Sequence, residues 1–444
     1  MRSKVQHINR GSSLKMEDID MLERLRETLE LNKEKYIKHL CDLVAIDTQD
    51  IGHGIEGGRE KAGQDYLISL FKDMHAHEVE IDQMTEEVIQ KAIALHGEGN
   101  PGHNYDDRYN VYATFSGKSN KTLMFNGHID TMPPASPELW SNPPHSPTIL
   151  NDKIYGVGVC DMKAGLMASI MAVKLLQDAG VELPVNVLIT SVVDEEGGGN
   201  GSIAAAMYGK KADGVVVCEC TDYKLVTANM GFVFFEVKIK GKAIHSASKW
   251  LGISAIEKAT KIMSAIQELE HNWLMNYKHP LLPPPTSNVG VIEGGTAGST
   301  TADSCVFKTC VHYLPKQMSH DQVVKEYIDA IMRCCESDLW LRENKPEISI
   351  YQSGGAFEIE TDAKIVKAFD NSYKKIIGRS VEITGSPAGC DSRVWHNIAR
   401  CPTIQYGPGR ISECHSVDEH VDIQHYLDAI LIYADMILHW DNYT

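Results

Sequence analysis

The segment Leu123–Thr131, an apolar strand that ends in two polar side chains, is the feature that most constrains the fold of this chain. Residues 123–125 predict the end of a buried strand, and Gly127 lets the backbone present His128 and Asp130 at its carboxyl edge. Ligands of open α/β sheets bind outside the carboxyl ends of the strands. The pair is therefore a candidate for a metal ligand and its orienting carboxylate, and an ordinary hydrogen-bonded turn is the alternative.

Similar side chains follow other apolar strands or turns further along the chain. They are Asp161, the adjacent pair Glu195 and Glu196, Glu219 and, in a late loop, His415. Carboxylates buried side by side repel each other strongly unless a cation lies between them. Two imidazoles and three carboxylates, one of them shared, form two similar sites with open positions for water. The pattern therefore predicts a pair of divalent metal ions.

Strands that alternate with helices indicate a mainly parallel mixed sheet flanked by helices. The 444 residues are too many for one ordinary core, and the pattern changes near Met230. Apolar residues then alternate with polar ones over 233–240, which is typical of a sheet with one face in water. We expect a smaller α+β domain, residues 230–345, inserted into a catalytic domain formed by residues 1–229 and 346–444.

Composition excludes several classes of partner. With 43 basic and 60 acidic residues the formal charge is −17, which argues against nucleic acid or an anionic membrane as a main partner. No apolar run approaches the length of about 18 residues that a membrane span needs. The eleven cysteines form no disulfide framework and no C-x-x-C pair, which indicates a cytoplasmic protein.

Five cysteines lie near the candidate ligands in the sequence: Cys160, Cys218, Cys220, Cys390 and Cys414. We interpret them as small packing residues. A dinucleotide site at Gly156-x-Gly158 is a further alternative. It is disfavoured because the charge of Asp161 would repel a pyrophosphate at that helix N-terminus.

The motifs occur in a specific order. G-H-x-D contains His128, G-x-G-x-x-D-M-K-x-G contains Asp161, D-E-E-G contains Glu195, a strand ends in Glu219, and H-x-x-x-E begins at His415. Over about residues 35–440 this order resembles the M20 family of metallopeptidases and deacylases, which includes acetylornithine deacetylase. The resemblance implies a hydrolase that cleaves the amide bond of an N-acyl amino acid or a related N-acyl amine. A metallo-dipeptidase or carboxypeptidase of the same family is one alternative, and an inactive family member that acts as a binding protein is another.

The resemblance also implies a role for each motif residue. Metal ligands would be His128, Asp161 as the bridging carboxylate, Glu196, Glu219 and His415. Asp130 would fix the ring of His128, and Glu195 would be the general base. Zinc is the expected metal, with cobalt or manganese as alternatives.

Residues 230–345 correspond to the family's lid, which implies a homodimer through this domain. His245 matches a lid histidine that stabilises the oxyanion in the partner's active site. Arg393 matches an arginine for the substrate carboxylate. Relatives have an asparagine where this chain reads Gly294–Ser299, so Ser299 or a neighbour would take over its contact with the small-molecule substrate.

Overall fold

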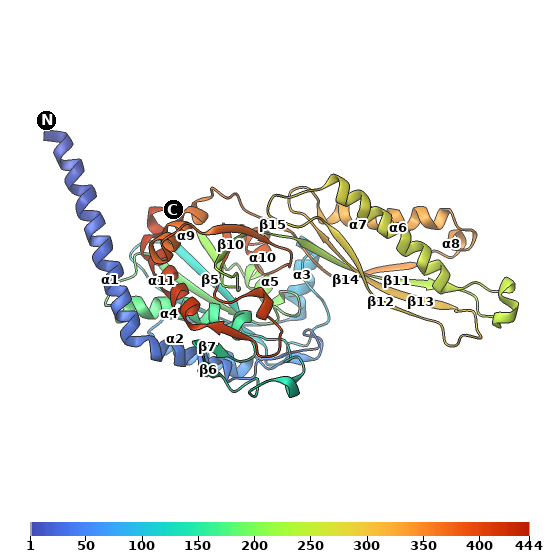
Figure 1. Cartoon of the computed structure of the whole chain (residues 1–444), viewed down its shortest axis with the longest axis horizontal. Coiled ribbons are helices and arrows are strands. Elements are labelled where there is room, and N and C mark those ends of the chain that lie inside the picture. Colours follow the sequence, from blue (N-terminus) through green and yellow to red (C-terminus); the bar gives the residue numbers. More distant parts are fainter. Residues whose placement is uncertain (1, 444) are drawn as a thin grey trace.

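A computed structural model describes the backbone of residues 2–443 and the side chains of residues 19–443. The chain folds into a large α/β body and a smaller domain beside it, and helix α1 (Arg2–Val44) extends out of the body at its N-terminal end (Figure 1). The predicted fold class, a mixed sheet flanked by helices with a smaller α+β domain, is confirmed.

The central sheet has nine strands in the described part of the chain. In spatial order they are β15 (Phe357–Glu358), β10 (Lys224–Asn229), β17 (Thr403–Gln405), β9 (Gly214–Val217), β5 (Thr122–His128), β8 (Asn186–Val192), β4 (Tyr109–Phe115) and β3 (Glu78–Gln83), with β16 (Glu382–Ser386) paired to β10. The middle strands β17, β9, β5 and β8 are parallel neighbours, and β4 and β3 run antiparallel at one side. The carboxyl ends of the four middle strands therefore meet at one edge.

Helices cover both faces of this sheet because successive strand residues point in opposite directions. Phe125 lies in a core with residues of α1, α4 (Ala164–Asp178) and α11 (Ile423–His439), whereas Met124 lies in a smaller core with Trp395 of α10 (Ser392–Asn397). The remaining helices of the body are α2 (Lys61–Asp73), α3 (Glu86–His96), α5 (Asn200–Met207) and α9 (Lys364–Ile377). None of the described helices combines the length and hydropathy of a membrane span.

The smaller domain is a four-stranded antiparallel sheet with helices on one face (Figure 1). Its elements are β11 (Gly231–Lys240), β12 (Thr286–Gly294), β13 (Ser304–Tyr313), β14 (Glu347–Gly354), α6 (Ala255–Asn276), α7 (His320–Glu336) and α8 (Leu339–Glu343). The predicted alternation on β11 is confirmed, since Val233, Phe235, Val237 and Ile239 are buried in one core with α6 and α7. The strands run to Gly354, so they extend past residue 345; the limits 230–345 stay a prediction.

Two small sheets flank the central one. One pairs β1 (Asp50–Ile51) with β2 (Gly57–Gly58). The other joins β18 (His420–Asp422), β7 (Lys153–Tyr155) and β6 (Thr148–Leu150), and it ties the last loop of the chain to the segment before α4.

Helix α4 begins against the edge where the middle strands end. Nearly all side chains of this apolar helix are buried. Close packing at its start depends on Gly165, because a Cβ atom there would lie 1.7 Å from the carbonyl oxygen of Cys218. The absence of a side chain thus lets the helix approach the end of β9.

We predict that Gly165→Ala lowers the free energy of unfolding by about 1–3 kcal/mol or more, because helix and strand must move apart. Urea unfolding measures this change. Gly298→Ala is the control, since a Cβ at Gly298 meets nothing within 4 Å, and its effect should stay within about 0.5 kcal/mol. Equal effects of the two substitutions would contradict the packing argument.

Candidate metal centre

Three neighbouring parallel strands place candidate ligands at the edge that the sequence predicts. His128 is the last residue of β5, Glu195 and Glu196 follow β8, and Glu219 follows β9. Since β5 pairs with both β8 and β9 in parallel, the three strand ends are adjacent. Residues up to 91 positions apart in the sequence therefore meet.

Asp161 and His415 reach the same place from loops. Asp161 lies in the segment Val159–Lys163 that leads into α4, and His415 follows the short helix Ile411–Glu413. The Asp161 segment is held by Glu419, whose carboxylate accepts hydrogen bonds from the backbone N–H groups of Gly158 (2.9 Å), Cys160 (2.8 Å) and Asp161 (3.1 Å). Glu419 is 2% exposed.

The five predicted ligands form two groups that share Asp161. Nε2 of His128 lies 3.1 Å from Oδ1 of Asp161 and 3.6 Å from Oε1 of Glu219. Nε2 of His415 lies 2.9 Å from Oε1 of Glu196 and 3.4 Å from Oδ2 of Asp161. In each group of three the potential ligand atoms all lie within 4.8 Å of one another. Asp161 directs one oxygen toward each group.

The acids and imidazoles of this cluster shift each other's pKa values. Burial raises the pKa of Glu219 well above its ordinary value, and the nearby carboxylate of Asp161 adds to the effect. Hydrogen bonds to Asp161 and Glu196 raise the pKa of His415 to about 11. Against the effect of burial, hydrogen bonds from His128 and His415 hold the pKa of Asp161 well below its usual range.

Such pKa shifts are expected in a pocket of buried carboxylates, which positive charge stabilises. Imidazole nitrogens and carboxylate oxygens, three to a group, are a donor set that zinc accepts, and each group leaves a coordination position open. The residues present therefore fit a pair of divalent ions.

The role of Asp130 differs in detail from the expected one. Nδ1 of His128 lies 2.9 Å from the backbone carbonyl oxygen of Asp130 but 3.7 Å from its carboxylate. The carboxylate instead accepts a hydrogen bond of 3.0 Å from the backbone N–H of Glu196. The ring of His128 is thus oriented by a main-chain oxygen, which the two-residue spacing allows, and the Asp130 side chain supports the neighbouring turn.

A buried ionic network behind the cluster was not found from the sequence. Arg108 lies 2.5 Å from Glu60, 3.1 Å from Asp50 and 3.2 Å from Asp194, and all four side chains are fully buried. Asp194 also contacts His103 at 2.9 Å. The network fixes the turn after β8, just before the two adjacent glutamates. The one signal of this network in the sequence is Arg108 itself, an arginine directly before the buried strand β4.

Glu195 stands apart from both groups. It is its neighbour Glu196 that contacts His415. Burial raises the pKa of Glu195 well above its ordinary value, and the charges of Asp391 and Glu219 also raise it. Glu195 therefore lies in the electrostatic environment of the cluster without belonging to either ligand group.

The other three predicted site residues, His245, Ser299 and Arg393, belong to neither ligand group. His245 and Ser299 are neighbours in the smaller domain, where the backbone of Ser299 accepts a hydrogen bond of 2.8 Å from Ser246 and the His245 ring accepts one from Ala247. The contacts that position them involve other residues of that domain.

Arg393 lies in the body and is 2% exposed. Its guanidinium contacts Glu98 at 3.2 Å and donates to the carbonyl oxygens of Cys390 (2.9 Å) and Gly198 (2.8 Å). A contact of Arg393 with a substrate carboxylate stays a prediction.

We predict that Glu419→Gln weakens metal retention on the order of 10- to 100-fold, because the amide NH₂ cannot accept the hydrogen bond from Gly158 and the Asp161 segment loosens. Competition with a chelator measures the affinity. Glu413→Gln, a half-buried neighbour in the same loop, should leave it unchanged. Unaltered affinity in Glu419→Gln would show that this carboxylate does not position Asp161.

Comparison with known proteins identifies the family of this chain. The sequence profile described as peptidase family M20/M25/M40 matches residues 124–439. N-formyl-4-amino-5-aminomethyl-2-methylpyrimidine deformylase of Bacillus subtilis (strain 168) is 32% identical over 343 residues, which cover 72% of this chain and 79% of that protein. Acetylornithine deacetylase of Photorhabdus laumondii subsp. laumondii is 27% identical over 391 residues, 84% of this chain and 97% of that protein.

Solved structures show the same fold. The M20 family metallo-carboxypeptidase Sso-CP2 from Sulfolobus solfataricus has a TM-score of 0.72 and 19% identity, over 90% of this chain and 98% of that chain. Together, the profile match and the relatives show that this chain belongs to peptidase family M20/M25/M40 and is a metal-dependent amidohydrolase.

Proposed function

We propose that this protein is a deacylase that hydrolyses the amide bond of a small N-acyl amine at two divalent metal ions, with zinc as the expected metal and cobalt or manganese as alternatives. His128, Asp161 and Glu219 would hold one ion, and Asp161, Glu196 and His415 the other. The observation that carries the proposal is the position of Asp161, which offers one carboxylate oxygen to each group.

The residues around the ions would divide the chemistry. When bound, the two ions supply an acidified water as nucleophile and polarise the amide carbonyl. Glu195 takes a proton from the attacking water and passes it to the leaving amine nitrogen. This assignment is supported by two observations: in addition to burial, the charges of Glu219 and Glu196, one from each ligand group, raise the pKa of Glu195, and Glu195 itself belongs to neither group. Asp130 orients His128 through its main-chain oxygen.

A short acyl group is favoured by the relatives. One is named a deformylase and another a deacetylase, and each matches more than two thirds of this chain. The carboxypeptidase structure is less than 25% identical, so it supports the fold and not the substrate. Peptidase activity and a binding protein without activity are the alternatives. Arg393 would contact the substrate only if the substrate carries a carboxylate. That carboxylate would then replace Glu98 as the partner of Arg393.

We further propose a homodimer through the smaller domain, residues 230–345. Strand β12 is the edge of its sheet, and Val291 and Ile292 on it are 41% and 50% exposed. An edge strand with exposed apolar side chains favours pairing with a second copy. In that arrangement His245 and Ser299 would reach the partner's metal centre, where His245 would stabilise the oxyanion. A cytoplasmic location is supported by the free state of the cysteines.

We predict that the zinc-loaded protein releases amines from N-formyl or N-acetyl substrates faster than it cleaves dipeptides, and that chelators abolish both activities. Glu195→Gln should lower kcat by at least about 10²-fold, because the amide cannot accept the proton. Metal analysis of this variant should still find two ions per chain.

The matched control is Glu196→Gln, which should lose metal as well as activity. Loss of metal in Glu195→Gln instead would mean that the two adjacent glutamates have exchanged roles. Two bound ions with no hydrolysis of any N-acyl amine or peptide would contradict the enzyme and favour the binding protein.

We predict that co-expression of His245→Ala with Glu195→Gln restores activity although each variant alone is inactive. One of the two sites in a mixed dimer then has both residues intact, so a random mixture should reach about a quarter of the wild-type rate. The control pair Glu195→Gln with Glu196→Gln should stay inactive, because both residues belong to the same subunit's site. A mixture of dimeric variants without recovery would contradict the role of His245 across the interface.

A further inference from the structure

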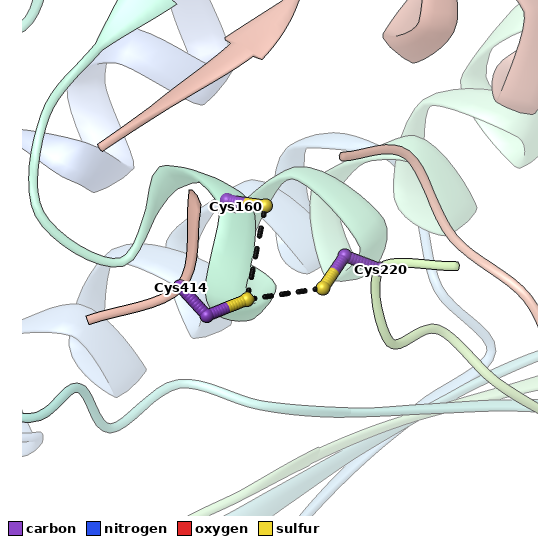
Figure 2. A group of neighbouring side chains, drawn as sticks. All are labelled: Cys160, Cys220 and Cys414. Atoms are coloured by element: carbon purple, nitrogen blue, oxygen red, sulfur yellow. Dashed lines mark hydrogen bonds between the residues drawn. The ribbon is translucent and has the colours of Figure 1, made fainter. Parts of the chain in front are cut away.

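Three cysteine side chains from distant parts of the chain meet beside the metal centre. Sγ of Cys414 lies 3.2 Å from Sγ of Cys220 and 4.0 Å from Sγ of Cys160, and all three sulfur atoms lie within 4.8 Å of one another (Figure 2). Cys160 comes from the segment before α4, Cys220 from the segment after β9, and Cys414 from the last loop. The sequence alone indicates a packing role for each of them.

The surroundings of the three sulfurs resemble a binding site more than a packed core. Cys160 and Cys220 are 0% and 4% exposed, whereas Cys414 is only half-buried and gives access from solvent. The backbone carbonyl oxygen of Arg410 lies 3.2 Å from Sγ of Cys160 and 3.7 Å from Sγ of Cys414. One oxygen thus lies next to the group of sulfurs.

The spacing suits a cation with tetrahedral coordination. A Zn–S distance of about 2.3 Å places two thiolates of such a site about 3.8 Å apart. The sulfur of Cys414 lies 4.0 Å from that of Cys160 and 3.2 Å from that of Cys220, on either side of this value. Among the described residues this group contains no histidine or carboxylate. Thiolates without harder ligands select soft cations, and three of them are better neutralised by a divalent than by a monovalent ion.

We propose that Cys160, Cys220 and Cys414 form a third metal site, for a thiophilic divalent cation of the zinc and cadmium class, with the carbonyl of Arg410 beside the fourth position. On binding, three S–H protons pass to solvent as three S–metal bonds form. The proposal goes beyond the hydrolytic function and does not depend on it.

The site is coupled to the metal centre through the sequence. Cys160 precedes Asp161, Cys220 follows Glu219 and Cys414 precedes His415. An ion held by the three sulfurs therefore joins the three chain segments that carry these ligands, and it stabilises their mutual arrangement by mass action.

The test is a titration of the zinc-loaded, full-length protein with Cd²⁺ in the presence of a phosphine reductant, followed by the ultraviolet thiolate-to-cadmium charge-transfer band. The ligands of the metal centre contain no sulfur, so Cd²⁺ that exchanges there adds nothing to the band. The expected result is saturation at one thiolate-bound Cd²⁺ per chain. In Cys414→Ser the affinity should fall at least about tenfold, and in the triple variant Cys160→Ser/Cys220→Ser/Cys414→Ser the band should disappear.

Cys310→Ser in strand β13 of the smaller domain is the control and should bind Cd²⁺ like the wild type. Cys414→Ser removes the least buried of the three thiols, so it keeps the test open if the triple variant does not fold. No charge-transfer band in the wild type, or an undiminished band in Cys414→Ser, would overturn the proposal. A Cys220–Cys414 disulfide that persists under the reductant would also overturn it.

Discussion

The repulsion between carboxylates at the carboxyl edge of β8, β5 and β9 is the constraint on which the rest of the structure depends. Asp161, Glu196 and Glu219 are mostly buried and lie within a few ångströms of two imidazoles, of which His128 is fully buried and His415 is 47% exposed. Such a cluster is stable only if each acid is fixed and its charge is compensated. Cations bound between the acids would supply the compensation, and the surrounding protein fixes the positions.

Different parts of the chain supply this fixation. Glu419 holds the Asp161 segment through three backbone N–H groups, and the ionic network of Arg108 holds the turn that precedes Glu195 and Glu196. Gly165 lets α4 start close to the end of β9. The candidate metal centre is thus part of a larger polar structure, in which His128, Asp161 and Glu196 are positioned by Asp130 and Glu419, residues that would not themselves touch an ion.

Much of this arrangement could be predicted because it depends on local patterns and one topological rule. The apolar run before His128 and the alternation on β11 specify strands, and parallel strands bring their carboxyl ends together. The roles of Arg108 and of Glu419, the last residue of the H-x-x-x-E motif, could not be predicted, because they arise from contacts over long sequence separations that no sequence period reveals. The three cysteines show the same limit: each looks like a packing residue alone, and only the fold brings their sulfur atoms together. His245 marks another limit, since one chain does not contain its proposed partner.

The proposed chemistry depends on the sharing of Asp161 between two ions. Anomalous diffraction at the zinc absorption edge, from crystals of the zinc-loaded protein, tests it most directly. We expect two peaks on either side of the Asp161 carboxylate, one contacted by His128 and Glu219 and the other by Glu196 and His415, whatever is bound at the three cysteines. A single peak at this edge of the sheet, or a peak without contact to Asp161, would contradict it.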